Sequence, residues 1–172
     1  MRLVFNNATL IDSVNPSLNV DKTVVVENGR IIDISEKEVN SGRSQIIDLK
    51  GACLLPGLWD VHIHPKHPAD PTTSIADHTV QFGQNLMSGL LESGVIGVRS
   101  GGSAHFMDVS WRKAFDSGGY VGPHVLASGY FLTTTGGHFL TSGHAMECDG
   151  PYGFVRAIRE QIKNEVNHIK LN

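Results

Sequence analysis

Short apolar runs separated by polar residues mark the first fifty positions of the chain. Residues 24–26 and 31–34 are two runs rich in β-branched residues, and Asn28 and Gly29 stand between them. An Asn-Gly pair favours a two-residue hairpin turn, because both residues tolerate positive φ. Further strands are expected at residues 3–5, 9–11 and 45–49. The pattern predicts a small antiparallel β segment.

From residue 52 onward, apolar runs alternate with longer helical patterns. Ser74 is a suitable N-cap and Gly94 a suitable C-cap for the first helix. The expected order is a strand at 54–64, a helix at 74–93, a strand at 95–99, a helix from Ser103 to residue 117, a strand at 124–128, a Gly- and Thr-rich loop at 129–150, a helix at 154–166 and a strand at 168–171.

This alternation of strands and helices is typical of parallel strands joined by helical crossovers. Four such strands form either a small open sheet or half of an eight-stranded (β/α)8 barrel of about 250 residues. The last element is a strand with no helix after it, which favours the half-barrel. The predicted fold class is therefore α/β, with an N-terminal β segment at residues 1–52 and the first four strands and three helices of a TIM-type barrel at residues 53–172.

The composition places the chain among globular proteins. Hydrophobic residues make up 40% and charged residues 18%, and 14 Lys and Arg against 17 Asp and Glu give a net charge of −3. That balance predicts neither nucleic acid nor a membrane as partner. Two cysteines, Cys53 and Cys148, are too few for a disulfide framework, and no apolar run suggests a signal peptide or a membrane span. These features predict a cytoplasmic protein with reduced thiols.

Histidine changes this picture, because most of the 9 histidines fall between Gly51 and Gly153 and neutral imidazole is the commonest metal ligand. On a strand, alternate side chains share a face, so Asp60, His62 and His64 are expected to point the same way. The two histidine Cα atoms would lie roughly 6.6–6.8 Å apart, from where two imidazoles can bind one ion. A bare His-x-His pair is a weak signal. At the carboxyl end of a barrel strand, however, it lies where such barrels build active sites.

Residues 56–64, Pro-Gly-Leu-Trp-Asp-Val-His-Ile-His, resemble the first-strand signature of the amidohydrolase superfamily. Three further stretches resemble its branch of imidazolonepropionase-like proteins and metal-dependent Xaa-Pro and Xaa-Arg dipeptidases. They are residues 93–99, the Gly-Gly-His of residues 136–138, and the segment from Asp149 to Lys170. The resemblance covers nearly the whole chain. It implies a TIM-type barrel preceded by part of a composite β-sandwich, which is incomplete here.

The resemblance also implies a site for one or two divalent metal ions. His62 and His64 would bind the more buried ion, and Lys170, carboxylated by CO2, would bridge it to a second. Zinc is the expected ion, although imidazole and carbamate ligands would also accept manganese, cobalt or iron. His168 and Lys170 alternate with apolar residues, which puts both on one face of the expected strand at 168–171.

Other polar residues near the expected site are assigned supporting roles. His138 and His144 lie in the loop after the third strand and are candidates for substrate contact, with an ordinary loop imidazole as the alternative for His144. Asp60 is expected to orient an imidazole. Arg99 is expected to pair with a structural acid rather than with a substrate carboxylate, although Ser100 stands where the family usually has aspartate. The remaining histidines are expected to be ordinary ones: His67, His78, His105 and His124.

The resemblance places part of the catalytic machinery beyond Asn172. Two further histidine ligands and a general-base aspartate are expected there, so no catalytic residue is assigned within this chain. We expect the N-terminal fragment of a metal-dependent hydrolase that acts on amide or dipeptide-like C–N bonds of small molecules, inactive alone, with a homo-oligomer as an option for the full-length protein. Two alternatives stay open. One is a mononuclear deaminase-type amidohydrolase in which Lys170 is not a ligand, and the other is a truncated binding or decoy chain without activity.

Overall fold

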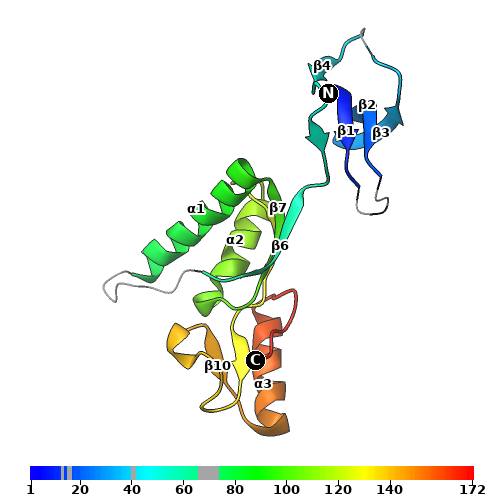
Figure 1. Cartoon of the computed structure of the whole chain (residues 1–172). Helices are drawn as coiled ribbons and strands as arrows, with labels where there is room; N and C mark the ends of the chain where they lie inside the picture. Colours follow the sequence, from blue (N-terminus) through cyan, green and yellow to red (C-terminus); the bar gives the residue numbers. More distant parts are fainter. Residues whose placement is uncertain (13, 15–16, 40–41, 66–73) are drawn as a thin grey trace. The chain divides into compact units, whose positions relative to one another are not determined.

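The computed structural model describes residues 1–12, 14, 17–39, 42–65 and 74–172 of the chain (Figure 1). The chain forms two compact units, Met1–Pro56 and Gly57–Asn172, which are described separately below. Within the described ranges, no helix has the length and apolar character needed to cross a membrane. His67 lies outside the described residues.

The first unit is a single five-stranded sheet with the order β3-β2-β1-β4, in which β5 also pairs with β1. The hairpin between β2 and β3 is confirmed, because Glu27 pairs with Arg30 and the two intervening residues, Asn28 and Gly29, have φ of 50° and 77°. The strand bounds are β1 (Arg2–Leu10), β2 (Asn19–Glu27), β3 (Arg30–Ser35), β4 (Gln45–Asp48) and β5 (Cys53–Leu54).

The prediction of a purely antiparallel segment is wrong. β4 and β5 both run parallel to β1, with Val4 opposite Ile46 and Thr9 opposite Cys53. The two short strands expected before the hairpin are one strand, β1, which continues through a register irregularity beside Asn7, whose φ is 54°. Parallel pairings join residues that are far apart in sequence, so a local turn signal cannot predict them.

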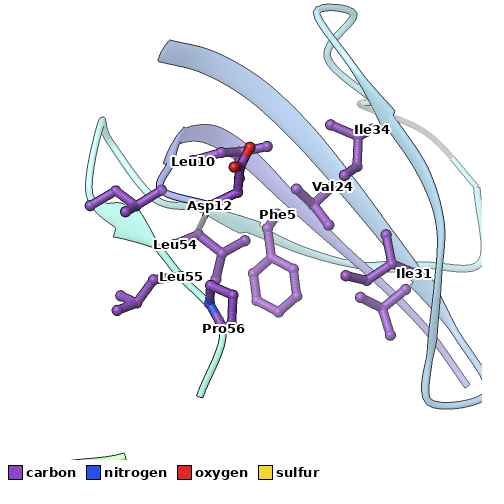
Figure 2. Close-up of a pocket in the computed structure, with 11 residues that line it drawn as sticks. Phe5, Leu10, Asp12, Val24, Ile31, Ile34, Leu54, Leu55 and Pro56 are labelled. Carbon is purple, nitrogen blue, oxygen red and sulfur yellow. The ribbon is translucent and has the colours of Figure 1, made fainter. Parts of the chain in front are cut away.

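One side of this sheet carries an apolar pocket of about 340 Å³ (Figure 2). Phe5 of β1, Val24 of β2 and Leu54 of β5 line it, and Ile31 and Ile34 of β3 border it while remaining 64% and 53% exposed. The first unit therefore has an uncovered apolar surface next to its own small core.

The second unit is built on a parallel sheet with the order β6-β7-β8, which confirms the predicted α/β alternation for these three strands. Side chains from two helices and from the sheet form the core of this unit, in which Phe82, Leu86, Val98, Met107 and Val125 are buried. The bounds are β6 (Leu58–Ile63), α1 (Ile75–Ser93), β7 (Val95–Ser100), the 3-10 helix η1 (Ala104–Phe106), α2 (Met107–Asp116) and β8 (His124–Leu126).

Local signals set the ends of α1 as expected. Ser74 and Asp77 form a reciprocal capping box at its start, and Gly94 ends it in the left-handed conformation, with φ of 68°. The expected strand at 54–64 is divided, because Leu54 belongs to β5 of the first unit and β6 begins only at Leu58. Pro56, which has no N–H to donate to a ladder, stands in the break.

The C-terminal third differs most from expectation. The expected loop at 129–150 contains two short parallel strands, and the following helix begins four residues earlier than expected. Residues 168–171 do not form the expected strand. Their one β-bridge among the described residues joins Leu171 to Leu132 of β9, and not to β8. The bounds are β9 (Phe131–Thr133), η2 (Leu140–Ser142), β10 (Ala145–Glu147) and α3 (Gly150–Lys163).

Candidate metal centre

The imidazoles of His62 and His64 converge at the carboxyl end of β6. Their Nε2 atoms lie 3.1 Å apart. Two nitrogen ligands at about 2.0–2.1 Å from a tetrahedral zinc ion would be separated by about 3.3–3.4 Å. The observed separation is therefore close to that of two ligands of one ion.

A backbone carbonyl fixes the orientation of His64. Its Nδ1 atom lies 3.0 Å from the carbonyl oxygen of Gly102, and because a carbonyl oxygen only accepts, Nδ1 carries the proton. The Nε2 lone pair then faces His62, which is the arrangement that metal-binding histidines use. Burial is the largest cause that lowers the pKa of His64, and the charges of His62 and Lys170 lower it further against the effect of the Gly102 hydrogen bond.

Gly101 makes room for the two imidazoles. A Cβ atom at this position would lie 2.5 Å from Nε2 of His62 and 3.0 Å from Nε2 of His64. Any side chain would therefore occupy the space between the two rings. Gly101 is not among the site residues predicted from the sequence, although the Gly101-Gly102 pair directly after β7 is a signal of close backbone approach.

The residues present fit part of a metal site. Structural and catalytic zinc sites use three or four protein ligands, and the His62–His64 pair supplies two. In the ranges that the structure describes, no three His, Cys, Asp or Glu side chains are grouped so as to hold an ion. Lys170 is the further candidate from the sequence. Its backbone oxygen accepts a hydrogen bond from the Leu132 N–H at 2.8 Å.

Asp60 and Arg99 both contact the backbone of β6. Asp60 Oδ1 accepts from the backbone N–H of His62 at 3.1 Å, so among the described residues it contacts the main chain and not an imidazole. Arg99 Nε donates to the carbonyl oxygen of Val61 at 2.8 Å. The pairing of β6 with β7 is irregular between Asp60 and Ile63, and the Arg99 hydrogen bond bridges the two strands at that point.

His144 lies beside the pair. It is 4% exposed, and its ring stacks on that of His64 with centroids 6.2 Å apart. Its Nδ1 atom accepts from the backbone N–H of Ala104 at 2.9 Å, so the neutral ring carries its proton on Nε2. His138 contacts two phenylalanine rings, those of Phe131 and Phe139, with centroids 6.5 and 5.8 Å away.

A buried polar network lies between the ends of β7 and β8. Asp108 is fully buried and its Oδ2 atom accepts from the backbone N–H groups of Ser128 and Gly129, at 2.8 and 3.0 Å. Ser100 joins this network through the hydroxyl of Ser128, and its carbonyl oxygen lies 3.0 Å from Nε2 of His168. Asp108 is not among the residues predicted from the sequence, because its partners lie 20 and 21 residues further along the chain.

The chain is similar in sequence to the ochratoxinase of Aspergillus niger. The two are 30% identical over 128 residues, and the match covers 72% of this chain and 26% of the relative. No family model matches the chain.

Solved structures cover almost the whole chain. A Xaa-Pro dipeptidase with methionine bound in its active site is 25% identical, with a TM-score of 0.87 over 99% of this chain and 47% of that one. A structure described as an amidohydrolase is 27% identical, with a TM-score of 0.83 over 99% of this chain and 46% of that one. The chain thus spans less than half the length of the solved structures it matches. These similarities in sequence and fold confirm the resemblance of the chain to the amidohydrolase superfamily.

Proposed function

We propose that the chain is the N-terminal part of a metal-dependent hydrolase that acts on amide or dipeptide-like C–N bonds of small molecules. The observation that carries this proposal is the convergence of the His62 and His64 Nε2 atoms at 3.1 Å, with His64 oriented by the Gly102 carbonyl. Similarity to a Xaa-Pro dipeptidase and to an ochratoxinase supports the reaction class.

Each candidate residue has a defined task in this proposal. His62 and His64 would hold one divalent ion, with zinc as the first choice, and Lys170 as a carbamate would bridge it to a second. A lysine must lose its proton to react with CO2, which neighbouring positive charge and burial favour. A divalent ion in such a site supplies Lewis acidity and activates water at neutral pH. His144 presents an N–H group beside His64, suited to donating to an oxygen atom of the substrate.

Uncovered apolar surfaces in each unit support the half-barrel and sandwich parts of the proposal. Trp59 and Val61 of β6 are 46% and 54% exposed, as expected for an edge strand of a barrel that further strands and helices complete. The apolar pocket of the first unit, with Ile31 and Ile34 exposed beside it, is suited to cover by additional strands of a sandwich. The remaining ligands and the general-base aspartate would come from those additional segments.

Metal titration tests the proposal. Zinc binding to the 172-residue chain is measured by calorimetry, and we expect His62→Ala and His64→Ala each to weaken it at least about tenfold, the loss of one ligand interaction. His124→Ala is the matched control, because His124 packs on Trp59 and belongs to neither the pair nor its hydrogen bonds. Equal zinc affinity in all three variants would refute the site.

Lys170 needs a separate test on the full-length protein. We expect two metal ions per chain in the unmodified full-length protein. Lys170→Ala should hold fewer, and should keep the ion that the histidines bind. One ion per chain in both the unmodified protein and Lys170→Ala would instead indicate a mononuclear site in which Lys170 is not a ligand.

A further inference from the structure

The turn that follows β7, residues 100–104, orients two stacked histidines. The carbonyl oxygen of Gly102 accepts from Nδ1 of His64 at 3.0 Å, and the backbone N–H of Ala104 donates to Nδ1 of His144 at 2.9 Å. In their neutral forms the two rings therefore carry opposite tautomers, with the proton on Nδ1 in His64 and on Nε2 in His144. The ring centroids lie 6.2 Å apart. A shift of this turn would change the orientation of both rings.

Ser103 stands between these two anchoring residues and is fully buried. Its backbone N–H donates to the carbonyl oxygen of Gly129 at 2.6 Å, and its hydroxyl accepts from the backbone N–H of Asp108 at 3.2 Å. The first hydrogen bond ties the turn to the segment after β8, and the second ties it to the first turn of α2. Ser103 can therefore move only by breaking hydrogen bonds in a buried place, where their loss is costly.

The carboxylate of Asp108 closes this arrangement into a ring of three hydrogen bonds. Asp108 is fully buried, and its Oδ2 atom accepts from the backbone N–H of Gly129 at 3.0 Å. Asp108 thus donates to Ser103, Ser103 donates to Gly129, and Gly129 donates back to Asp108. The neighbouring N–H of Ser128 donates to the same oxygen at 2.8 Å. A buried network whose members are all paired is rigid, so the carboxylate fixes the place of the turn.

The same turn also contacts the other segments that carry candidate ligands. Its first residue, Ser100, accepts on its carbonyl oxygen from Nε2 of His168 at 3.0 Å, two residues before Lys170. The backbone N–H of Gly101 donates to the carbonyl oxygen of Ile63 at 2.7 Å, between the two histidines of β6. The position of the turn therefore affects both the histidine pair and the segment with the candidate lysine.

We propose that Asp108 is a positioning residue for the candidate metal centre, acting through Ser103 and Gly129 on the turn that sets the tautomer of His64. The inference rests on the proposed function, because it gives this carboxylate a task in holding a metal ligand. Nε2 of His64 can bind a cation only while its lone pair is free, so the ring must keep its proton on Nδ1. The printed hydrogen bonds of the carboxylate go to backbone N–H groups, so its effect on the ring passes through the turn.

NMR signals of the histidine ring nitrogens test the inference on the metal-free 172-residue chain, at about pH 8, where neutral histidine predominates. The unmodified chain should carry the His64 proton on Nδ1. In Asp108→Asn and in Ser103→Ala we expect the tautomer ratio of His64 to shift at least about fivefold toward the Nε2-protonated form, the effect of weakening one hydrogen bond. Zinc affinity of the same two variants, measured by calorimetry, should fall at least about tenfold.

Trp111→Phe is the matched control, because it removes a hydrogen bond from the same helix, α2, to the carbonyl oxygen of Thr79, outside the turn. It should lower stability and leave the His64 tautomer unchanged. The positioning role would be overturned by an unshifted tautomer in folded Asp108→Asn or Ser103→Ala, by an equal shift in Trp111→Phe, or by a proton on Nε2 in the unmodified chain. Failure of the unmodified chain to bind zinc would count against the proposed function alone, since the tautomers are measured without metal.

Discussion

The hydroxyl of Thr135 donates a short hydrogen bond to the carboxylate of Asp149, whose other oxygen accepts from the Thr135 backbone N–H at 3.0 Å. Glu147 adds a second contact, because its Oε1 atom accepts from the Gly136 N–H at 2.9 Å. Two carboxylates, one at the end of β10 and one at the start of α3, thus bind successive residues of the turn that leads to His138. The backbone of His138 is itself held by Thr133, whose hydroxyl accepts from its N–H at 3.2 Å.

Loss of the Asp149 carboxylate should loosen this turn. In Asp149→Asn, one side-chain acceptor and the negative charge are lost, so we expect amide exchange at Thr135 and Gly136 to become several-fold faster. Hydrogen exchange followed by NMR measures this directly. Asp116→Asn, at the exposed end of α2, is the control and should leave both amides unchanged. Unchanged protection in Asp149→Asn would mean that Glu147 and Thr133 hold the turn without it.

The same contact predicts a pH dependence. The side-chain and backbone hydrogen bonds from Thr135 lower the pKa of Asp149, so its carboxylate stays ionised in the folded state below the pH at which it is protonated in the unfolded state. Its contribution is therefore complete above about pH 4, the ordinary aspartate value, and is lost as the pH falls through the lower folded-state pKa. Protection of the Thr135 amide, measured from pH 6 to pH 3, should decline only in the acidic part of that range. A decline near pH 6 would point to a histidine instead.

A methyl group at position 101 should disrupt the candidate metal centre without removing a ligand. In Gly101→Ala the added Cβ lies closer than 3.0 Å to the His62 ring, so the imidazoles must move apart. We expect zinc affinity to fall at least tenfold and the free energy of unfolding to fall by about 1–3 kcal/mol, as for other overpacked sites. Calorimetry and urea denaturation measure the two effects.

Gly89→Ala is the matched control for this substitution. Gly89 lies within α1, and a Cβ there would meet no atom within 4 Å. The variant should bind zinc normally and gain up to about 1 kcal/mol of stability from helix propensity. If Gly101→Ala behaved in the same way, the close approach at the His62–His64 pair would play no part in metal binding.

Features set by neighbouring residues could be predicted from the sequence. The turn at Asn28 and Gly29 and the caps at Ser74 and Gly94 follow from side-chain chemistry and backbone freedom within a few positions. The strand period also predicted that His62 and His64 share a face, and their Nε2 atoms do converge.

Features set by distant contacts could not be predicted in this way. The partner of His64 Nδ1 is a carbonyl 38 residues away, and β4 runs parallel to β1 although no local residue specifies its direction. The segment expected as a strand at 168–171 has the alternation of a strand. A ladder also requires a neighbouring strand, however, and only Leu132 pairs with it among the described residues. Period and propensity indicate what a segment can form, and the available partners decide what it does form.

The buried carboxylate of Asp108 should be among the most sensitive positions of the second unit. It is fully buried and accepts from three backbone N–H groups, those of Val109, Ser128 and Gly129. In Asp108→Ala these donors lose their acceptor inside the protein, and we expect the free energy of unfolding to fall by about 2–4 kcal/mol. Asp108→Asn keeps one oxygen and should lose less, whereas the exposed Asp116→Ala should change stability by less than about 0.5 kcal/mol. Urea denaturation of the three variants measures the order. If Asp108→Ala were as stable as Asp116→Ala, water would have to satisfy the freed N–H groups, and the carboxylate could not be what joins α2 to the segment after β8.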